Sequence, residues 1–448
     1  MPYIPNTDAD RKEMLEAADC KSIAELWQKA QIRTAPPALE HIPAGMSEYE
    51  VTRHLSSLAS QNAIHLVNFV GSGYYDHLIP AAVGTMVGRS EFYTAYTPYQ
   101  PEASQGTLQA IYEYQSAICR LTSMPMSNAS LYDGGTALFE AIMMAVRITN
   151  RRQAVISGAV SPIFREMIKC YSSNLDIELV VVPVNASKTD SSQDALVEAV
   201  SDKTACVIVQ YPNVFGTVEE WSETVEKVHA KKAIAVCSAY PIALAMLKTP
   251  GEMGFDIVTG EGQSLGIPLS FGGPYLGFMA VREKLVRKMP GRIVGRTVDL
   301  DGKPGFVLTL QAREQHIRRE HAMSNICSNE SLCALTALAY LTCIGKEGLL
   351  QVGNLCAAKA NFARDLLLQI KGIEPVGEKA FFNEFVIKLP GDSSEIVGKM
   401  IDKGFAAGFP LGRYYHDRKN QLLVAVTEKR TREEIKAFAN AMEAVLWS

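Results

Sequence analysis

The sequence predicts an α/β protein with a mainly parallel central sheet and a small α+β domain at its C-terminal end. Between residues 65 and 313, short apolar runs alternate with amphipathic, helix-like segments. The runs lie at residues 154–156, 179–184, 206–209, 234–236, 256–258 and 276–281. Near-continuous apolar strands between helices are typical of a parallel sheet that is covered on both faces and joined by right-handed crossovers. The chain has 448 residues and 47% hydrophobic content, which is enough for two or three domains.

The N-terminal region, residues 1–62, is expected to form a helical arm. The sequence Asp8-Ala-Asp can cap a helix over residues 11–18. Ser22 and Glu25 have the Ser-x-x-Glu spacing of a capping box. We therefore predict helices in this arm, followed by a large α/β domain over residues 63–320.

The last part of the chain, residues 321–448, is predicted to be the small α+β domain. An apolar, helix-like segment around residues 332–344 comes first. A strand, a helix, a second strand and a second helix are expected at 385–389, 394–403, 422–426 and from the capping box Thr431-x-x-Glu434 onward. No internal repeat or low-complexity tract interrupts this order.

Composition narrows the classes of function. The formal net charge of -4 is small for this length, so nothing global indicates binding to nucleic acid or to an anionic membrane. The nine cysteines include no CxxC pair, which favours reduced thiols in a cytoplasmic protein and no metal site; His321 near Cys327 lacks further paired ligands. The polar N-terminus has no signal-peptide pattern, and no uncharged apolar stretch reaches the roughly 18 residues of a membrane span.

A glycine turn before a long helix carries the first chemical indication. In the sequence YDGGTALFEAIMMAVR, Gly134, Gly135 and Thr136 precede a run of good helix formers. Free backbone N–H groups and the positive end of the helix dipole meet at such a turn, so it can hold a phosphate or another anion. The simpler alternative is that Asp133 or Thr136 caps the helix.

A phosphate turn, several β/α units and a small C-terminal domain together have the layout of the aminotransferase-like pyridoxal-phosphate fold, fold type I, with its seven-stranded type of sheet. Ligands of such sheets lie beyond the carboxyl ends of the strands. The cofactor needs a lysine for its Schiff base and usually an acid beside its pyridine nitrogen. By chain order, the acid should end the strand at 233–236 and the lysine should follow the strand at 256–258. The sequence has Cys237-Ser-Ala-Tyr240 and Glu261-Gly-Gln263 at these places.

Several long motifs resemble the first subunit of the two-chain glycine cleavage P-proteins. They are SEFYTAYTPYQPE (90–102), SQG (104–106), YDGGTA (132–137), GQSLGIP (262–268), FGGP (271–274), REQHIRRE (313–320) and SNIC (324–327). The resemblance runs from the sequence YIPNTDAD near the start to the C-terminal domain. One departure is His321-Ala-Met323, where a lysine and a threonine are expected around the alanine.

The resemblance implies a division of labour between two chains. In that family the second subunit carries pyridoxal phosphate on a lysine, and the first has a related fold without it. Aligning the shared Ile267-Pro268 places Gln263 at the lysine position and, by similar reasoning, Tyr240 at the position of the pyridine acid. An amide forms no stable Schiff base, and a phenol is too weak an acid to replace a carboxylate. This chain is therefore expected to hold no covalent cofactor and no catalytic residue of its own.

The reaction that the resemblance implies begins when the amine of glycine displaces the partner's lysine from the cofactor. Carbon dioxide leaves, and the aminomethyl group passes to the lipoyl arm of the H-protein, which is reduced. This chain is expected to complete its partner's pocket across a shared interface, in a cytoplasmic α2β2 assembly. The alternative is a self-sufficient pyridoxal-phosphate decarboxylase or aminotransferase that uses another lysine, such as Lys248.

A tyrosine-rich loop is the candidate for contact with the partner's substrate. Rigid aromatic rings with hydroxyl groups suit an interface where an apolar arm meets a small amino acid, although they also serve as ordinary interface packing. The candidates are Tyr93, Tyr96, Tyr99 and Gln100, beside Phe92 and between stiffening prolines at 98 and 101. The glycine-flanked loop at 71–77 is a second candidate.

A basic cluster follows at residues 313–319. If the segment is helical, Arg313 and His316 share one face, because residues three apart are neighbours on a helix. The cluster, completed by Arg318 and Arg319, could attract a carboxylate or an acidic H-protein. A solvated helix face that also carries Glu314 and Glu320 is the other explanation.

Overall fold

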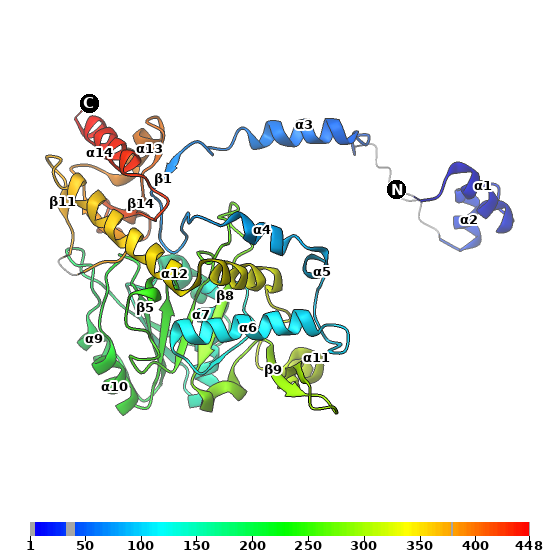
Figure 1. Cartoon of the computed structure of the whole chain (residues 1–448), viewed down its shortest axis with the longest axis horizontal. Coiled ribbons are helices and arrows are strands. Elements are labelled where there is room, and N and C mark those ends of the chain that lie inside the picture. Colours follow the sequence, from blue (N-terminus) through cyan, green and yellow to red (C-terminus); the bar gives the residue numbers. More distant parts are fainter. Residues whose placement is uncertain (1–4, 33–40, 378–379, 448) are drawn as a thin grey trace. The chain divides into compact units, whose positions relative to one another are not determined.

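A computed structural model describes residues 5–32, 41–377 and 380–447 (Figure 1). Its contacts divide the chain into two units, Met1–Ile64 and His65–Ser448. The predicted boundaries at 62 and 320 stay predictions, although the first lies two residues from this division. Each unit is described by itself.

The first unit contains three capped helices, α1 (Asp8–Ala17), α2 (Ile23–Lys29) and α3 (Glu48–Ala59). The predicted start of α1 is wrong by three residues, because the helix begins at Asp8 instead of residue 11 and Thr7 caps it in a box with Asp10. At α2 the Ser22 hydroxyl accepts from the Glu25 N–H at 3.2 Å, as a capping box requires, but the Glu25 carboxylate accepts from Lys21 instead of Ser22.

The second unit is built on a seven-stranded sheet with the order β2-β8-β7-β6-β5-β3-β4. Five consecutive strands of this order, from β7 to β4, are parallel; β8 runs antiparallel to β7, and the short β2 pairs antiparallel with β8. Their bounds are β2 (Met126–Ser127), β3 (Gln153–Ser157), β4 (Glu178–Val182), β5 (Thr204–Tyr211), β6 (Ile234–Ala239), β7 (Ile257–Glu261) and β8 (Gly277–Val281). The predicted fold class is confirmed: each of the six apolar runs contains a strand or overlaps one.

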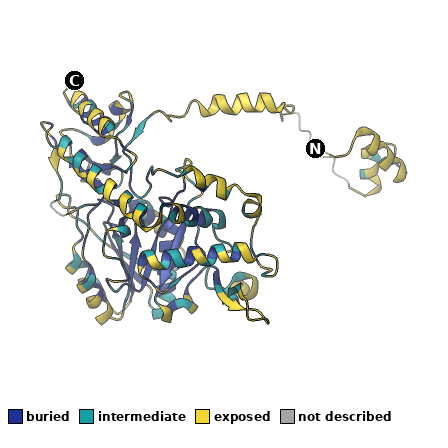
Figure 2. Ribbon diagram, in the orientation of Figure 1, coloured by how far each residue is buried: buried dark blue, intermediate teal, exposed yellow. Residues whose placement is uncertain are grey.

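Both faces of this sheet are buried, as the apolar runs indicate. Along β5, Cys206 and Ile208 belong to one hydrophobic cluster, and Val207 and Val209 belong to another. Because successive strand residues point to opposite faces, a strand buried on both sides must be apolar at every position. Figure 2 shows the central strands in the buried colour.

Helices cover the two faces. On the face of Cys206 the main cover is α7 (Gly134–Thr149), which contains three alanines and two methionines, all good helix formers. The other helices of this region are α4 (Ala81–Val87), α5 (Ser90–Tyr93), α6 (Gln105–Thr122), α8 (Pro162–Ser172), α9 (Gln193–Glu198) and α10 (Ser222–Ala230). A hairpin of β9 (Ile293–Val298) and β10 (Pro304–Thr309) packs beside α6.

The C-terminal part has the expected mixture of strands and helices. A four-stranded sheet has the order β11-β12-β15-β14, and β13 pairs with β1. The bounds are β1 (Val67–Asn68), β11 (Glu374–Pro375), β12 (Glu384–Lys388), β13 (Phe405–Ala406), β14 (Phe409–Pro410), β15 (Gln421–Ala425), α13 (Ser393–Ile401) and α14 (Arg432–Leu446). The predicted capping box of Thr431 and Glu434 opens α14.

Helix α12 (Ser331–Leu367) connects the large and small sheets. By length and composition it could cross a membrane, although it contains no uncharged apolar run of roughly 18 residues. Gly345, with φ 62 and ψ -175, divides it into two helices. Ala337 and Tyr340 of the first part lie in the same core cluster as strand residues such as Val207, and long core helices of soluble proteins meet the same criterion.

Candidate functional site

The place where fold type I proteins hold their cofactor is nearly filled by this chain's own side chains. It lies beyond the carboxyl ends of β5, β6 and β7, and a space of about 20 Å³ remains there. The lining residues are Gly73, Tyr75, Phe164, Gln210, Ser238, Ala239, Tyr240 and Glu261. A space of this size holds about one water, whereas pockets for small organic ligands measure roughly 300–1,000 Å³.

The glycine turn at the start of α7 is capped from within the chain. Asp133 accepts from the Thr136 N–H at 2.9 Å and from the Thr136 hydroxyl at 2.7 Å. The Gly134 N–H donates to Oε2 of Glu261 at 2.9 Å. Two carboxyl groups thus accept hydrogen bonds at the positive end of the helix.

The two glycines of the turn pack closely against neighbouring side chains. A Cβ atom on Gly134 would lie 2.9 Å from atoms of both Glu261 and Phe164, and one on Gly135 would lie 2.5 Å from the sulfur of Met167. Side chains therefore pack directly against both glycines, and the Gly134 N–H is already bonded to Glu261. The residues present do not fit a bound pyridoxal phosphate, so no step of a mechanism is assigned to that group on this chain.

Glu261 takes the place of the anion. Its carboxylate accepts hydrogen bonds from the backbone N–H groups of Gly134, Gln263 and Leu276, at 2.9, 3.0 and 3.0 Å. Burial raises its pKa to about 7, against the opposing effect of these three donors. Glu261 was not predicted as a site residue. The sequence feature that could have indicated it is its position at the end of a strand, before two glycine-rich turns.

Gln263, the residue predicted at the lysine position, is 2% exposed and fully engaged. Its side-chain amide donates to the carbonyl oxygens of Tyr75 and Ile267, at 3.0 and 2.7 Å. Its Oε1 accepts from the Tyr75 N–H at 2.9 Å. Both amide hydrogens and the amide oxygen therefore serve as links between two loops.

Tyr240, predicted at the position of the pyridine acid, lies at the end of β6 and also bonds within the chain. Its hydroxyl is 2.5 Å from Nε2 of His77, whose Nδ1 is 2.6 Å from Oε2 of Glu428. Its ring lies 4.4 Å from the Tyr75 ring. Burial raises the pKa of Tyr240 well above its ordinary value, so the phenol stays protonated.

His77, Cys356 and Glu428 form the one group of possible metal ligands among the residues that the structure describes, with donor atoms within 4.8 Å of one another. The 2.6 Å separation of Nδ1 and Oε2 is that of a hydrogen bond and is too short for two donors around one zinc ion at its usual bond lengths. The ammonium of Lys359 also donates to the Glu428 carbonyl. We assign the group as a hydrogen-bond network.

A larger hollow of 330 Å³ opens beside Gln263. One wall is the segment 75–79, and the opposite wall is the turn formed by residues 267–269. Lys429, paired with Asp76 at 2.7 Å, closes one side. The hollow therefore lies directly beside the filled cofactor place.

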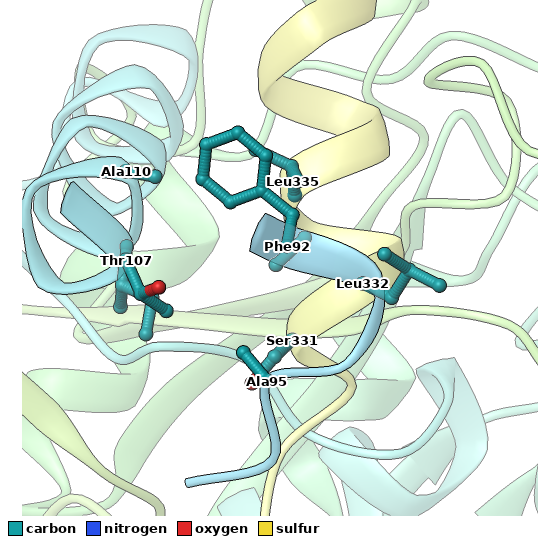
Figure 3. Close-up of a pocket in the computed structure, with 9 residues that line it drawn as sticks. Phe92, Ala95, Thr107, Ala110, Ser331, Leu332 and Leu335 are labelled. Atoms are coloured by element: carbon teal, nitrogen blue, oxygen red, sulfur yellow. The ribbon is translucent and has the colours of Figure 1, made fainter. Parts of the chain in front are cut away.

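The tyrosine-rich loop is largely exposed, as a surface for a partner would be. Tyr93, Tyr96 and Tyr99 are 67%, 75% and 49% exposed, and Gln100 is also exposed. Tyr99 is nevertheless anchored: its hydroxyl accepts from the buried guanidinium of Arg292 at 2.8 Å, and that guanidinium also lies over its ring. Phe92, by contrast, turns inward toward Leu335 of α12 in a small apolar pocket (Figure 3).

Replacing Tyr99 by phenylalanine should destabilise the chain by about 1–2 kcal/mol, because it leaves a buried donor of Arg292 without its acceptor. Chemical unfolding of the chain measures this change. Tyr96→Phe is the matched control, since that hydroxyl lies in solvent and its loss should cost less than about 0.5 kcal/mol. Equal stability of the two variants would contradict the anchoring role of Arg292.

The basic segment is not one helix, so the condition for a shared face of Arg313 and His316 is not met. A 3-10 turn, η3 (Gln311–Arg313), ends at Glu314, whose backbone is extended, and a four-residue helix, α11 (Gln315–Arg318), follows. Arg313 is partly buried and donates to the Gly291 carbonyl at 2.7 Å, whereas His316 is exposed and lies edge-on to Tyr99. Arg318 and Arg319 are exposed.

Known proteins of one family are similar to this chain over its full length. The family model described as "Glycine cleavage system P-protein" matches residues 1–442. The "Probable glycine dehydrogenase (decarboxylating) subunit 1" of Geotalea daltonii is 52% identical, and that of Geotalea uraniireducens is 53% identical; each match covers 100% of both chains.

Solved structures show the same relationship. The glycine decarboxylase (P-protein) of the glycine cleavage system, in inhibitor-bound form, has a TM-score of 0.91 and 38% identity over 100% of both chains. A Lactobacillus brevis glutamate decarboxylase has a TM-score of 0.69 at 12% identity, covering 94% of this chain and 97% of the other, and shows the fold alone. The chain therefore has the fold of the type I pyridoxal-phosphate enzymes, without a fitting place for the cofactor.

Proposed function

Because this chain belongs to the glycine cleavage system P-protein family, we propose that it is subunit 1 of a two-chain glycine dehydrogenase (decarboxylating), with pyridoxal phosphate on a lysine of the second subunit. The observation that carries this proposal is the filled cofactor place. Gln263 stands at the lysine position, Glu261 accepts from the Gly134 N–H in the turn that would bind phosphate, and only about 20 Å³ of space remains beside Glu261 and Tyr240.

The contribution of this chain is to complete the partner's pocket. The tyrosine-rich loop supports this role, since it presents exposed aromatic rings while Arg292 holds its base in place. Such rings offer contact area and hydrogen bonds at low entropic cost to glycine or to an apolar lipoyl arm. The proposed assembly contains two copies of each subunit, works in the cytoplasm and delivers the aminomethyl group to the lipoyl H-protein.

The test uses the chain alone and together with the lysine-bearing subunit. Glycine–bicarbonate exchange in the presence of pyridoxal phosphate is expected only when both chains are present. Borohydride reduction followed by mass spectrometry should find the cofactor on the second subunit alone.

A reducible adduct on this chain would overturn the proposal in favour of a self-sufficient enzyme. Lys248 is the residue to examine, although its ammonium is already bonded to Glu220 at 3.2 Å and to Ser222 at 3.0 Å. Exchange activity from this chain alone would have the same consequence.

A further inference from the structure

We propose that Gln263 is a positioning residue that fastens the segment 71–79, so that the former cofactor place now acts as an anchor for a loop on the partner-facing side. This inference rests on the proposed function for the identity of the partner. It concerns how this chain holds its own segment 71–79. This role of Gln263 does not follow from the absence of a lysine.

Gln263 binds the backbone of Tyr75 from both sides. Its Oε1 accepts from the Tyr75 N–H at 2.9 Å, and its Nε2 donates to the Tyr75 carbonyl at 3.0 Å. The side-chain amide thus pairs with one residue of the loop as a neighbouring strand would. Its second N–H donates to the Ile267 carbonyl at 2.7 Å, which ties the same amide to the turn across the hollow.

Other buried groups fasten the same segment at both ends. Oε1 of Glu384 accepts from the Ser72 N–H at 2.6 Å, and Oε2 accepts from the Tyr75 hydroxyl at 2.7 Å. At the far end, Oε1 of Glu428 accepts from the Leu78 N–H at 2.7 Å, and Oε2 bonds to His77. A loop normally exposes its backbone to water, so this number of buried partners indicates that its conformation is fixed.

The fastened segment leads directly to the surface that the partner is proposed to meet. It forms one wall of the 330 Å³ hollow, and Leu78, 62% exposed, is its outward-facing member. Helices α4 and α5 and the tyrosine-rich loop follow it in the chain. Loosening Gln263 should therefore disturb this surface first and leave the chemistry on the partner intact.

The test compares Gln263→Leu with wild type in the two-chain complex. Leucine approximates the volume of glutamine and removes its three side-chain hydrogen bonds. Amide exchange in peptides covering residues 72–79 is expected to quicken at least tenfold, with β5 (204–211) unchanged. The KM for lipoyl H-protein should rise at least threefold while kcat stays within twofold. Gln109→Leu is the control and should change none of these values. Gln109 lies on an exposed face of α6, and among the described contacts its side chain bonds only to Glu113, at 2.8 Å.

Gln263→Glu gives a second readout that a purely structural role would not produce. A glutamate can still accept from the Tyr75 N–H, but its other oxygen faces the carbonyls of Tyr75 and Ile267. Protonation restores one donor there. The titratable and charged groups around position 263 are Glu261, which accepts from the N–H of residue 263, and Tyr75, Asp76, His77 and Lys429, which line the same hollow. Both proteins carry these groups, so the comparison is made as a ratio to wild type. The H-protein KM of this variant, relative to wild type, should therefore fall at least threefold from pH 8 to pH 6.

The outcomes separate the two proposals. Unchanged exchange at residues 72–79 in Gln263→Leu, or faster exchange with an unchanged KM, overturns the positioning role. If Gln263→Leu does not fold, a pH-independent KM ratio for Gln263→Glu overturns it instead. Failure of the proposed function would appear in the wild-type chain, as an adduct or as activity without the second subunit.

Discussion

Replacing Gln263 by lysine is expected to give a chain that still forms no aldimine with pyridoxal phosphate and that loses about 2–5 kcal/mol of stability. The new ammonium could donate to the carbonyls of Tyr75 and Ile267, but it cannot accept from the Tyr75 N–H. It would also carry a charge into a position that is 2% exposed. Both effects make the lysine costly here.

The lysine alone cannot restore the cofactor place, because the other parts of that place are occupied. The rings of Tyr75 and Tyr240 lie 4.4 Å apart beside it, and Glu261 bonds to the glycine turn. Borohydride reduction with peptide mapping tests the absence of an aldimine, and urea unfolding measures the lost stability. A stoichiometric adduct at position 263 would show that the place opens more readily than its packing indicates.

Much of the fold followed from the sequence because it depends on local patterns. Apolar residues at every position of the run at 206–209 predict burial on both faces, and the structure buries Cys206 and Val207 in two different clusters. The box of Thr431 and Glu434 opens a helix for an equally local reason. Local spacing was not sufficient for the basic segment at 313–319. Its spacing allowed one helix, but the extended backbone at Glu314 interrupts it.

The candidate site was less predictable because its contacts join distant parts of the chain. The motif around Gln263 indicated that a lysine was missing, and it did not indicate what the glutamine binds, since Tyr75 lies 188 residues away. Glu384 and Glu428 were not predicted at all. They come from the C-terminal part of the chain and reach the segment 71–79 only in the folded structure. A buried carboxylate among distant backbone donors leaves no periodic pattern in the sequence.

Replacing Glu384 by glutamine is expected to make the chain more stable than wild type at pH 8, by about 3 kcal/mol. Burial raises the pKa of Glu384 to about 7 from an ordinary value of 4.5, although the Ser72 N–H and the Tyr75 hydroxyl favour its charged form. Between these pH values the folded chain holds a proton that the unfolded chain has released. The contribution of Glu384 to the free energy of unfolding of the wild type is therefore fully present below pH 4.5, and it is lost as the pH rises through 7.

Glutamine can keep both hydrogen bonds without titrating. Its carbonyl oxygen accepts from the Ser72 N–H, and its amide donates to the Tyr75 hydroxyl, which then acts as the acceptor. The difference in stability between variant and wild type should be small at pH 5, grow through pH 6 and 7 and level off near pH 8. Thermal and urea unfolding across this range measure it, with the exposed Glu433→Gln as the control. A constant difference would mean that Glu384 is charged throughout, and that its two donors outweigh its burial.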